Sequence, residues 1–273
     1  MSRYKAVASD LDGTLFNKEM RVSEENLAAI EKIAKLGVEF VPTTGRTLAE
    51  ISPTLLENPN IRYVIYSNGS AIWDKEKNTH TKACMSGEVA NSILNLLSSY
   101  EVHITLRAGG KTYVNKETQT KEMREYNRVS YYHGIVLDSH AERIDNFEEF
   151  MRGLDEVEVF SVFFHSDEEY AECLAKLSER EDVIYATTLK HNCEIFSKDS
   201  GKANAIKSLA KLISATTDEI ISVGDSDNDM TMIRAAGLGL ATANAHEQLK
   251  KAAKRVICSN EEHIADYILK NIL

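Results

Sequence analysis

A short apolar run at residues 4–8 leads directly into Asp10-Leu11-Asp12-Gly13-Thr14. The run predicts a β-strand, and Gly13 predicts a sharp turn just after it. Residues two apart on an extended backbone point the same way, so Asp10 and Asp12 are expected to face one small volume. Carboxylates this close need a cation or hydrogen bonds to offset their repulsion. A hard divalent ion such as Mg²⁺ meets that need, and a solvated turn is the plain alternative for this stretch taken alone.

A helix and a second strand follow the opening strand. Ser23 is a good N-cap with two glutamates behind it, and apolar residues then recur at helical spacing until Gly37. Residues 38–41 form a short apolar strand that runs into Pro42-Thr43-Thr44-Gly45-Arg46. A strand, a helix and a strand in this order predict a βαβ unit with parallel strands.

The next two elements extend the same pattern. We expect a second helix over residues 48–56 and a third strand over residues 63–66, which ends at Ser67-Asn68-Gly69. Each predicted strand therefore ends in a loop rich in Asp, Thr, Asn and Gly. Ligands of doubly wound sheets bind at the carboxyl ends of the strands, so these loops are the expected binding edge.

The pattern changes over residues 84–186. Alternating apolar and polar residues at 102–106, a Gly109-Gly110 turn and residues 111–114 predict a β-hairpin. Further helices and strands surround it, among them a strand at 157–164 and another at 183–186. We therefore predict an inserted α+β domain over residues 84–186, and an α/β core made of residues 1–83 and 187–273.

The α/β pattern resumes near the carboxyl end. Gly201-Lys202 opens a predicted helix, and residues 219–223 form a strand of the buried type. Directly after this strand comes Gly224-Asp225-Ser226-Asp227-Asn228-Asp229, the densest acidic loop of the chain. By topology this loop joins the Asp10 region and Thr44 at one edge of the sheet.

Composition narrows the classes of function. The formal charge of −10 with no basic stripe disfavours a nucleic-acid or anionic-membrane surface. We see no export signal and no apolar stretch of membrane length. The cysteines and histidines lack metal-ligand spacing. A cytoplasmic protein with reduced thiols and no obligate protein partner is the resulting expectation.

Carboxylates for a hard metal, together with a hydroxyl, a lysine and backbone amides for an anion, describe a site for phosphoryl transfer. Aspartate is also a known covalent nucleophile in such chemistry. Lys202 at a predicted helix start lies where backbone N–H groups also favour an anion.

These segments resemble the ordered motifs of the haloacid dehalogenase-like superfamily. The motifs are Asp10-Leu11-Asp12-Gly13-Thr14, Thr44-Gly45-Arg46, Lys202 and the loop from Gly224 to Asp229. The inserted domain resembles the α/β cap of the Cof-type hydrolase subfamily. The resemblance runs along the whole chain and implies a Rossmann-like core, a parallel sheet flanked by helices, beneath a cap that sets substrate specificity.

The resemblance also implies a role for each motif residue. Asp10 would be the nucleophile, and Asp12 would protonate the leaving oxygen and then deprotonate the attacking water. Mg²⁺ would be held by the Asp10 carboxylate, the Asp12 backbone carbonyl and Asp225, and Asp229 would orient these groups from behind. The phosphoryl oxygens would be held by Thr44, the amides near Leu11 and Gly45, Lys202 and Asn228.

The sequence departs from the usual family pattern at a few places. Ser9 replaces a common aromatic residue, Thr242-Ala243-Asn244 replaces a glycine-containing loop, and Glu262-His263-Ile264 replaces an Asp-Gly-Val run. None of these departures changes a motif residue.

The expected activity is Mg²⁺-dependent hydrolysis of phosphate monoesters of small soluble metabolites, with sugar phosphates favoured. A phosphomutase stays open, because the same aspartyl-phosphate can be returned to a sugar hydroxyl. A catalytically idle sensor of a phosphorylated ligand stays open as well. A dehalogenase is disfavoured, since Asp12 is the acid that a phosphate ester needs.

Overall fold

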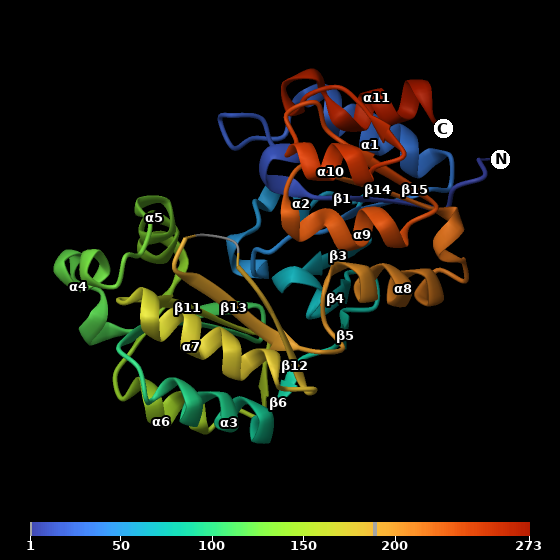
Figure 1. Cartoon of the computed structure of the whole chain (residues 1–273). Helices are drawn as coiled ribbons and strands as arrows, with labels where there is room; N and C mark the ends of the chain where they lie inside the picture. Colours follow the sequence, from blue (N-terminus) through green and yellow to red (C-terminus); the bar gives the residue numbers. More distant parts are fainter. Residues whose placement is uncertain (1, 188–189) are drawn as a thin grey trace. The chain divides into compact units, whose positions relative to one another are not determined.

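The computed structural model describes residues 2–187 and 190–273 (Figure 1). Contacts within the described residues divide the chain into two units. The core unit comprises Met1–Gly45, Ile51–Lys82 and Gly201–Leu273, and the cap unit comprises Arg46–Glu50 and Ala83–Ser200.

The core unit contains a five-stranded sheet in the order β16-β15-β14-β1-β2, in which all neighbours are parallel. Its strands are β1 (Ala6–Ser9), β2 (Glu39–Pro42), β14 (Ile220–Gly224), β15 (Leu238–Ala241) and β16 (Arg255–Val256). Strand β1 lies inside the sheet between β14 and β2, and all of its side chains are buried. The predicted βαβ unit and parallel sheet are therefore confirmed, and burial on both faces explains why these strands read as apolar runs.

Helices cover both faces of this sheet. Ala6 and Ala8 of β1 face a buried cluster with Ile206, Leu209 and Met232, whereas α1 and α11 pack against each other away from it (Figure 1). The helices are α1 (Glu24–Lys35), α2 (Pro53–Leu56), α8 (Lys202–Leu212), α9 (Met230–Ala235), α10 (Glu247–Ala252) and α11 (Ile264–Asn271).

Helix α1 illustrates how individual residues determine where a helix begins and which of its side chains are buried. The Ser23 hydroxyl accepts a hydrogen bond from the Asn26 backbone N–H, which satisfies one of the unpaired donors of the first turn. Ile30 and Ile33 are buried as the apolar spacing predicts. Leu36, however, lies in the C-cap and is 50% exposed, so the buried stripe ends one turn earlier than expected.

The third predicted strand, β3 (Tyr63–Tyr66), lies beside β2 through a parallel bridge between Thr43 and Ile65. It then pairs antiparallel with β4 (Ala71–Asp74), which pairs with β5 (Thr79–Lys82). This hairpin was not predicted, because the side chains of β5 are all exposed and polar or charged.

The predicted helix over residues 48–56 is instead two short pieces. A 3₁₀ turn over Leu48–Glu50 ends before Ser52, and α2 then begins at Pro53. Proline lacks a backbone N–H and disfavours helical geometry in the residue before it, so it begins a new helix here.

The cap unit contains a six-stranded sheet in the order β12-β13-β11-β7-β8-β9. Its strands are β7 (Val102–Ala108), β8 (Lys111–Asn115), β9 (Glu142–Ile144), β11 (Val159–Phe164), β12 (Val183–Ala186) and β13 (Asn192–Ser197). A short pair, β6 (Met85–Ser86) and β10 (Glu156–Val157), lies in a separate sheet. The predicted β7–β8 hairpin is confirmed, with its turn at Gly109-Gly110.

One face of the cap sheet is apolar and is covered by helices. Ile104, Leu106 and Phe160 pack in a buried cluster with residues of α3, α6 and α7. The helices of the cap unit are α3 (Gly87–Leu97), α4 (Lys121–Tyr126), α5 (Tyr131–His140), α6 (Phe147–Arg152) and α7 (Asp167–Ser178). Helix α4 begins after Thr120, whose hydroxyl accepts a hydrogen bond from the Met123 backbone N–H.

The unit boundaries differ from the expected ones. Strand β13 pairs with β11 and β12, so residue 187 and residues 190–200, which the sequence places in the core, group with the cap unit. The segment Arg46–Glu50, in the middle of the core sequence, also groups with the cap unit. Both differences arise from contacts between residues far apart in the chain, which local patterning does not record.

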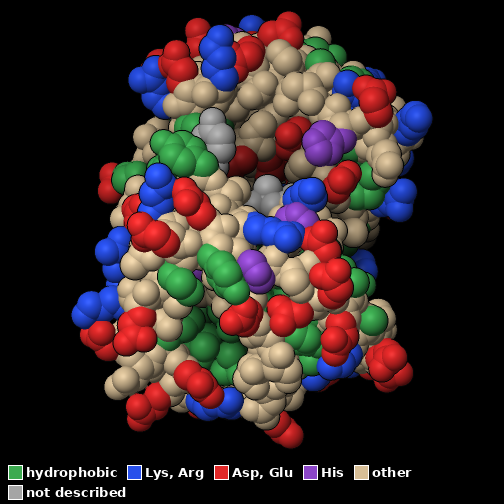
Figure 2. Space-filling view, turned by 60° about the vertical axis from the view of Figure 1, so that its left-hand side comes forward, with side chains coloured by type: hydrophobic (Ala, Val, Ile, Leu, Met, Phe, Trp, Pro, Cys, Tyr) green, Lys and Arg blue, Asp and Glu red, His purple; other side chains and the backbone are tan. Residues whose placement is uncertain are grey.

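Two further observations concern the charges on the surface and the length of the helices. On the face seen in Figure 2, Lys and Arg side chains are interspersed with Asp and Glu and form no continuous basic stripe. Over the described residues, no helix combines the length and apolar character that crossing a bilayer requires.

Candidate active site

Asp10 lies at the carboxyl end of the interior strand β1, where its backbone N–H donates to the Val223 carbonyl at 3.0 Å. Its side chain is only 4% exposed. The chain then makes one wide turn over Leu11–Leu15, closed by a 3.3 Å hydrogen bond from the Leu15 N–H to the Asp10 carbonyl. The turn fixes Asp10 at the sheet edge.

Gly13 is required in this turn for two reasons. Its φ of +78° is a conformation that side-chain-bearing residues rarely adopt. A Cβ at this position would also lie 2.3 Å from Oδ2 of Asp225. The turn that follows β1 and the loop that follows β14 are therefore packed in direct contact.

Lys202, the first residue of α8, joins two carboxylates. Its Nζ donates to Asp10 Oδ1 and to Asp229 Oδ1, both at 2.7 Å, and its side chain is 2% exposed. Burial opposes the charge on this lysine, and the two carboxylates outweigh that effect and raise its pKa. Lys202 is thus held as a cation at the carboxyl edge of the sheet.

Asp229 organises the acidic loop. Its Oδ2 accepts hydrogen bonds from the backbone N–H groups of Asp225 at 3.0 Å and Ser226 at 3.1 Å, and it is fully buried. With Oδ1 held by Lys202, both oxygens are used inside the protein. This is the position of a residue that orients Asp225 and Lys202.

Asp10, Asp225 and Asp229 form a group that could hold a metal ion, because each offers an oxygen and these atoms lie within 4.8 Å of one another. Burial, and then the neighbouring carboxylate of Asp229, raise the pKa of Asp225 to about 6 and that of Asp10 well above its usual range. The single positive charge of Lys202 does not neutralise the negative charges of these three carboxylates. A hard divalent cation with oxygen ligands fits this donor set.

The predicted anion-binding residues come together beside this group. The Thr44 carbonyl accepts a 3.0 Å hydrogen bond from the Asn68 N–H. Asn228 Nδ2 donates to Asn68 Oδ1 at 3.4 Å, and a Cβ on Gly45 would lie 3.0 Å from the same oxygen. The Leu11 side chain is fully buried. Asp12 is half-buried in the turn.

With this geometry in place, comparison with known proteins identifies the family. The profile of the haloacid dehalogenase-like hydrolase family matches residues 7–268. The chain belongs to this family. It is therefore an enzyme of the hydrolase type, as the resemblance of its motifs predicted.

Similar proteins align with this hydrolase along almost its full length. The phosphatase YwpJ of Bacillus subtilis is 29% identical and aligns with 98% of this chain and 100% of its own. The 5-amino-6-(5-phospho-D-ribitylamino)uracil phosphatase YwtE, also of B. subtilis, is 27% identical and aligns over 98% of each chain. A solved structure of a haloacid dehalogenase-like hydrolase from B. subtilis superposes with a TM-score of 0.80 at 28% identity, covering 98% of this chain and 100% of its own.

Two asparagines near the site were not among the predicted site residues. Asn68 has a φ of +54° after β3, where it links Thr44 to Asn228. Asn244 Nδ2 donates to the Gly13 carbonyl at 2.7 Å and so supports the turn after β1. For Asn68 the available signal was its position after a predicted strand, and Asn244 lies in the loop that departs from the family pattern.

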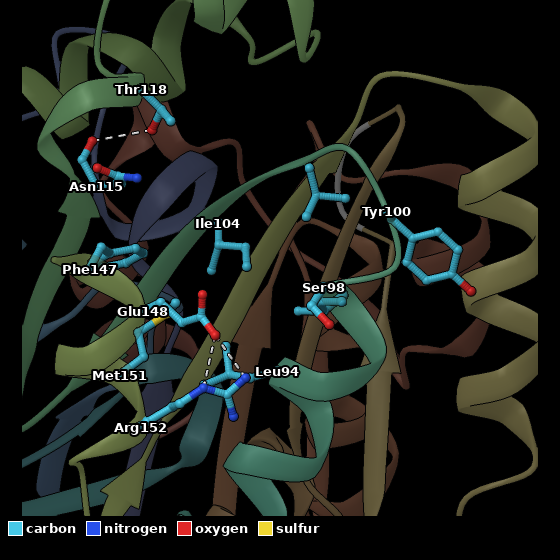
Figure 3. A pocket seen from close by; sticks show the side chains of 12 residues that line it. Leu94, Ser98, Tyr100, Ile104, Asn115, Thr118, Phe147, Glu148, Met151 and Arg152 are labelled. Carbon is cyan, nitrogen blue, oxygen red and sulfur yellow. Dashed lines mark hydrogen bonds and ion pairs between the residues drawn. The ribbon is translucent and has the colours of Figure 1, made fainter.

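The hydrolase also has a cavity of about 220 Å³ within the cap unit (Figure 3). It is lined mainly by apolar side chains of α3, β7 and α6, and its charged residues Glu148 and Arg152 pair with each other at 2.9 Å. It offers no cluster of carboxylates and no unpaired lysine or arginine for a phosphate among its described lining residues. The Asp10 edge of the core sheet is therefore the candidate active site.

Proposed function

We propose that this protein is a Mg²⁺-dependent phosphatase that hydrolyses phosphate monoesters of small metabolites through an aspartyl-phosphate at Asp10. The observation that carries the proposal is the buried arrangement of Asp10, Lys202 and Asp229 with Asp225 alongside. A lysine held between two buried carboxylates, one of them directly after β1, suits phosphoryl transfer, which depends on charge neutralisation and positioning.

The metal would be held by the Asp10 carboxylate, the Asp12 backbone carbonyl and Asp225. The raised pKa of Asp225, caused first by burial and next by Asp229, supports this assignment because the group is short of positive charge. When bound, Mg²⁺ supplies charge neutralisation at the nucleophile and the phosphoryl group. Asp229 would keep Asp225 oriented through its hydrogen bonds to the loop.

In the first step, an Asp10 carboxylate oxygen attacks phosphorus and the bond from phosphorus to the ester oxygen breaks. Asp12 gives its proton to that departing oxygen. In the second step Asp12 takes a proton from water, the water oxygen attacks phosphorus, and the bond from phosphorus to Asp10 breaks. Lys202 favours the ionised form of Asp10 through the bond from its Nζ, while burial and the neighbouring charge of Asp229 act against it and raise the pKa of Asp10.

The phosphoryl oxygens would be held by Lys202, Thr44, Asn228 and the amides of Leu11 and Gly45. Support comes from the way Asn68 fastens Thr44 and Asn228 to one another. Backbone and amide donors held in place before the reaction act without reorganising during it.

We favour sugar or polyol phosphates as substrates. Support comes from the name of the relative YwtE, which specifies a phosphorylated ribityl compound.

A cytoplasmic location belongs to the same proposal. The cysteines Cys173, Cys193 and Cys258 are free thiols. Thiols outside disulfides favour a reducing compartment, where small phosphorylated metabolites are found.

The proposal is tested by phosphate release from p-nitrophenyl phosphate. We expect release that requires Mg²⁺, stops with EDTA, and falls roughly a thousandfold or more in Asp10→Asn, which keeps the shape and loses the nucleophile. Asp227→Asn, in the exposed part of the acidic loop, is the matched control and should stay within about twofold of wild type. Release that survives in Asp10→Asn would contradict the assignment.

A phosphomutase is separated by its product. A hexose 1-phosphate incubated with the enzyme should yield free phosphate, and an isomeric hexose phosphate without phosphate release would establish the mutase instead.

A further inference from the structure

The chain passes between the core and cap units at four places, between residues 45 and 46, 50 and 51, 82 and 83, and 200 and 201. The first two bracket Arg46–Glu50, which we call the strap. The strap belongs to the cap unit by its contacts, yet it directly follows Thr44 and Gly45, the proposed phosphate-binding residues of the core.

Specific hydrogen bonds hold the strap to the cap sheet. The Ala49 N–H donates to the Gly110 carbonyl at 3.1 Å, in the turn between β7 and β8. Thr112 of β8 donates its hydroxyl proton to Glu50 Oε1 at 2.7 Å. Leu48 packs on the same turn, where a Cβ on Gly110 would lie 3.2 Å from Leu48 Cδ1.

Glu50 is the organising residue of the strap. Its Oε2 accepts a hydrogen bond from the Thr47 N–H at 3.0 Å, and its carbonyl accepts one from Arg46 Nη1 at 2.9 Å. Glu50 is 5% exposed, and Thr47 and Thr112 are buried around it. A buried carboxylate requires such partners, and hydrogen bonds to a charged acceptor are stronger than neutral ones.

Thr44, two residues before the strap, is anchored to the core by hydrogen bonds of its backbone. The Thr44 N–H donates to the Ile65 carbonyl of β3 at 2.9 Å, and its carbonyl accepts from Asn68. Gly45 alone separates this anchored residue from the strap. A displacement of the strap must therefore be absorbed by the backbone of Gly45 or by a shift of Thr44.

We propose that Glu50 is a positioning residue: by binding Thr112 it fastens the strap to the cap unit, so that the position of the cap sets the geometry of the Thr44-Gly45 loop. The assignment of that loop to phosphate rests on the function proposed above. The mechanical link from Glu50 to Thr44 does not, because it follows from the contacts and the covalent chain alone.

The link is tested without any ligand by amide hydrogen exchange resolved at single residues. Thr112→Val removes the donor while keeping the shape, and Glu50→Gln weakens the acceptor if Thr112→Val fails to fold. Both should speed exchange at least threefold within the strap and also at Thr44. Thr118→Val, a matched change on the cap away from the strap, should leave both rates unchanged.

Faster exchange in the strap with an unchanged rate at Thr44 would overturn the coupling. Unchanged exchange in the strap itself would show that the Glu50–Thr112 bond does not hold it. Either result can be obtained even if the protein hydrolyses nothing, so failure of the link and failure of the proposed function are distinguishable.

Kinetics then distinguish positioning from plain structural support. Because the loop would grip phosphoryl oxygens in substrate and product alike, both variants should raise KM for p-nitrophenyl phosphate and Ki for inorganic phosphate at least fivefold, with kcat within twofold of wild type. A lower kcat at unchanged KM and Ki would indicate only loss of folded enzyme, and it would contradict a positioning role.

Discussion

At the scale of single residues, the active-site edge depends on one buried cation. Lys202 lies between Asp10 and Asp229 with almost no exposure to solvent. Removal of one partner from such a group leaves buried charge without compensation, which costs far more than loss of a surface ion pair.

We therefore predict that Lys202→Met reduces kcat at least a hundredfold and lowers the free energy of unfolding by about 3–5 kcal/mol in metal-free protein. Urea unfolding with and without Mg²⁺ measures this, and added Mg²⁺ should restore part of the loss. Lys207→Met, on the exposed side of the same helix, is the control and should change neither quantity. Equal stability of the Lys202 and Lys207 variants would contradict this account of the site.

Replacement of Gly13 should affect both stability and metal binding. Gly13→Ala meets both a positive φ and the Asp225 carboxylate at 2.3 Å, whereas Gly37→Ala meets a φ of +73° with no atom within 4 Å. Both should lose about 1–2 kcal/mol of stability from the backbone conformation. Only Gly13→Ala should weaken Mg²⁺ binding, at least tenfold by calorimetry. Matching Mg²⁺ affinities in the two variants would show that Asp225 takes no part in the metal site.

At the scale of secondary structure, local patterns predicted the elements whose signals are local. The run before Asp10, the Ser23 cap and the strand before Gly224 each lie where residue spacing placed them. The sequence did not reveal the β4–β5 hairpin, because the exposed residues of β5 carry no apolar alternation. Residue patterns place strand β13 in the wrong unit. Its pairing with β11 joins residues about thirty positions apart, and local sequence does not show such a pairing.

Strand β7 carries a buried titratable residue, His103. His103 is 1% exposed, and burial, with Arg124 as the next cause, lowers the pKa of its imidazole to about 4. The folded state therefore holds His103 neutral at pH values where the unfolded chain, with an ordinary pKa of about 6.5, binds a proton.

Stability should accordingly be unaffected by His103 above pH 6.5 and should decline as the pH falls from 6.5 to 4, by up to about 1.4 kcal/mol per pH unit from this residue. Urea unfolding of the cap, followed across this range, measures the slope. His103→Gln should reduce the slope by close to one proton, while His140→Gln, exposed at the end of α5, should not. An unchanged slope in His103→Gln would contradict the burial of a neutral imidazole.

At the scale of the whole molecule, the ordered motifs allowed the family and the candidate site to be predicted from sequence, because their residues follow strands whose carboxyl ends must meet. The supporting residues could not be predicted in the same way. Asn68 and Asn244 act through hydrogen bonds to backbone groups of distant loops, and Glu50 acts through Thr112 of the cap sheet, which is distant in sequence. Such roles depend on tertiary contacts that no single stretch records.

The central claim is a covalent phosphoryl group on Asp10, and trapping it is the most direct test. Asp12→Ala lacks the base that would activate water, and p-nitrophenyl phosphate has a leaving group that departs without an acid. With Mg²⁺, this variant should release one equivalent of p-nitrophenol per enzyme in a burst and then stall. Mass spectrometry should then find the phosphoryl group on Asp10. A burst without modification of Asp10, or steady turnover at the wild-type rate, would contradict the mechanism.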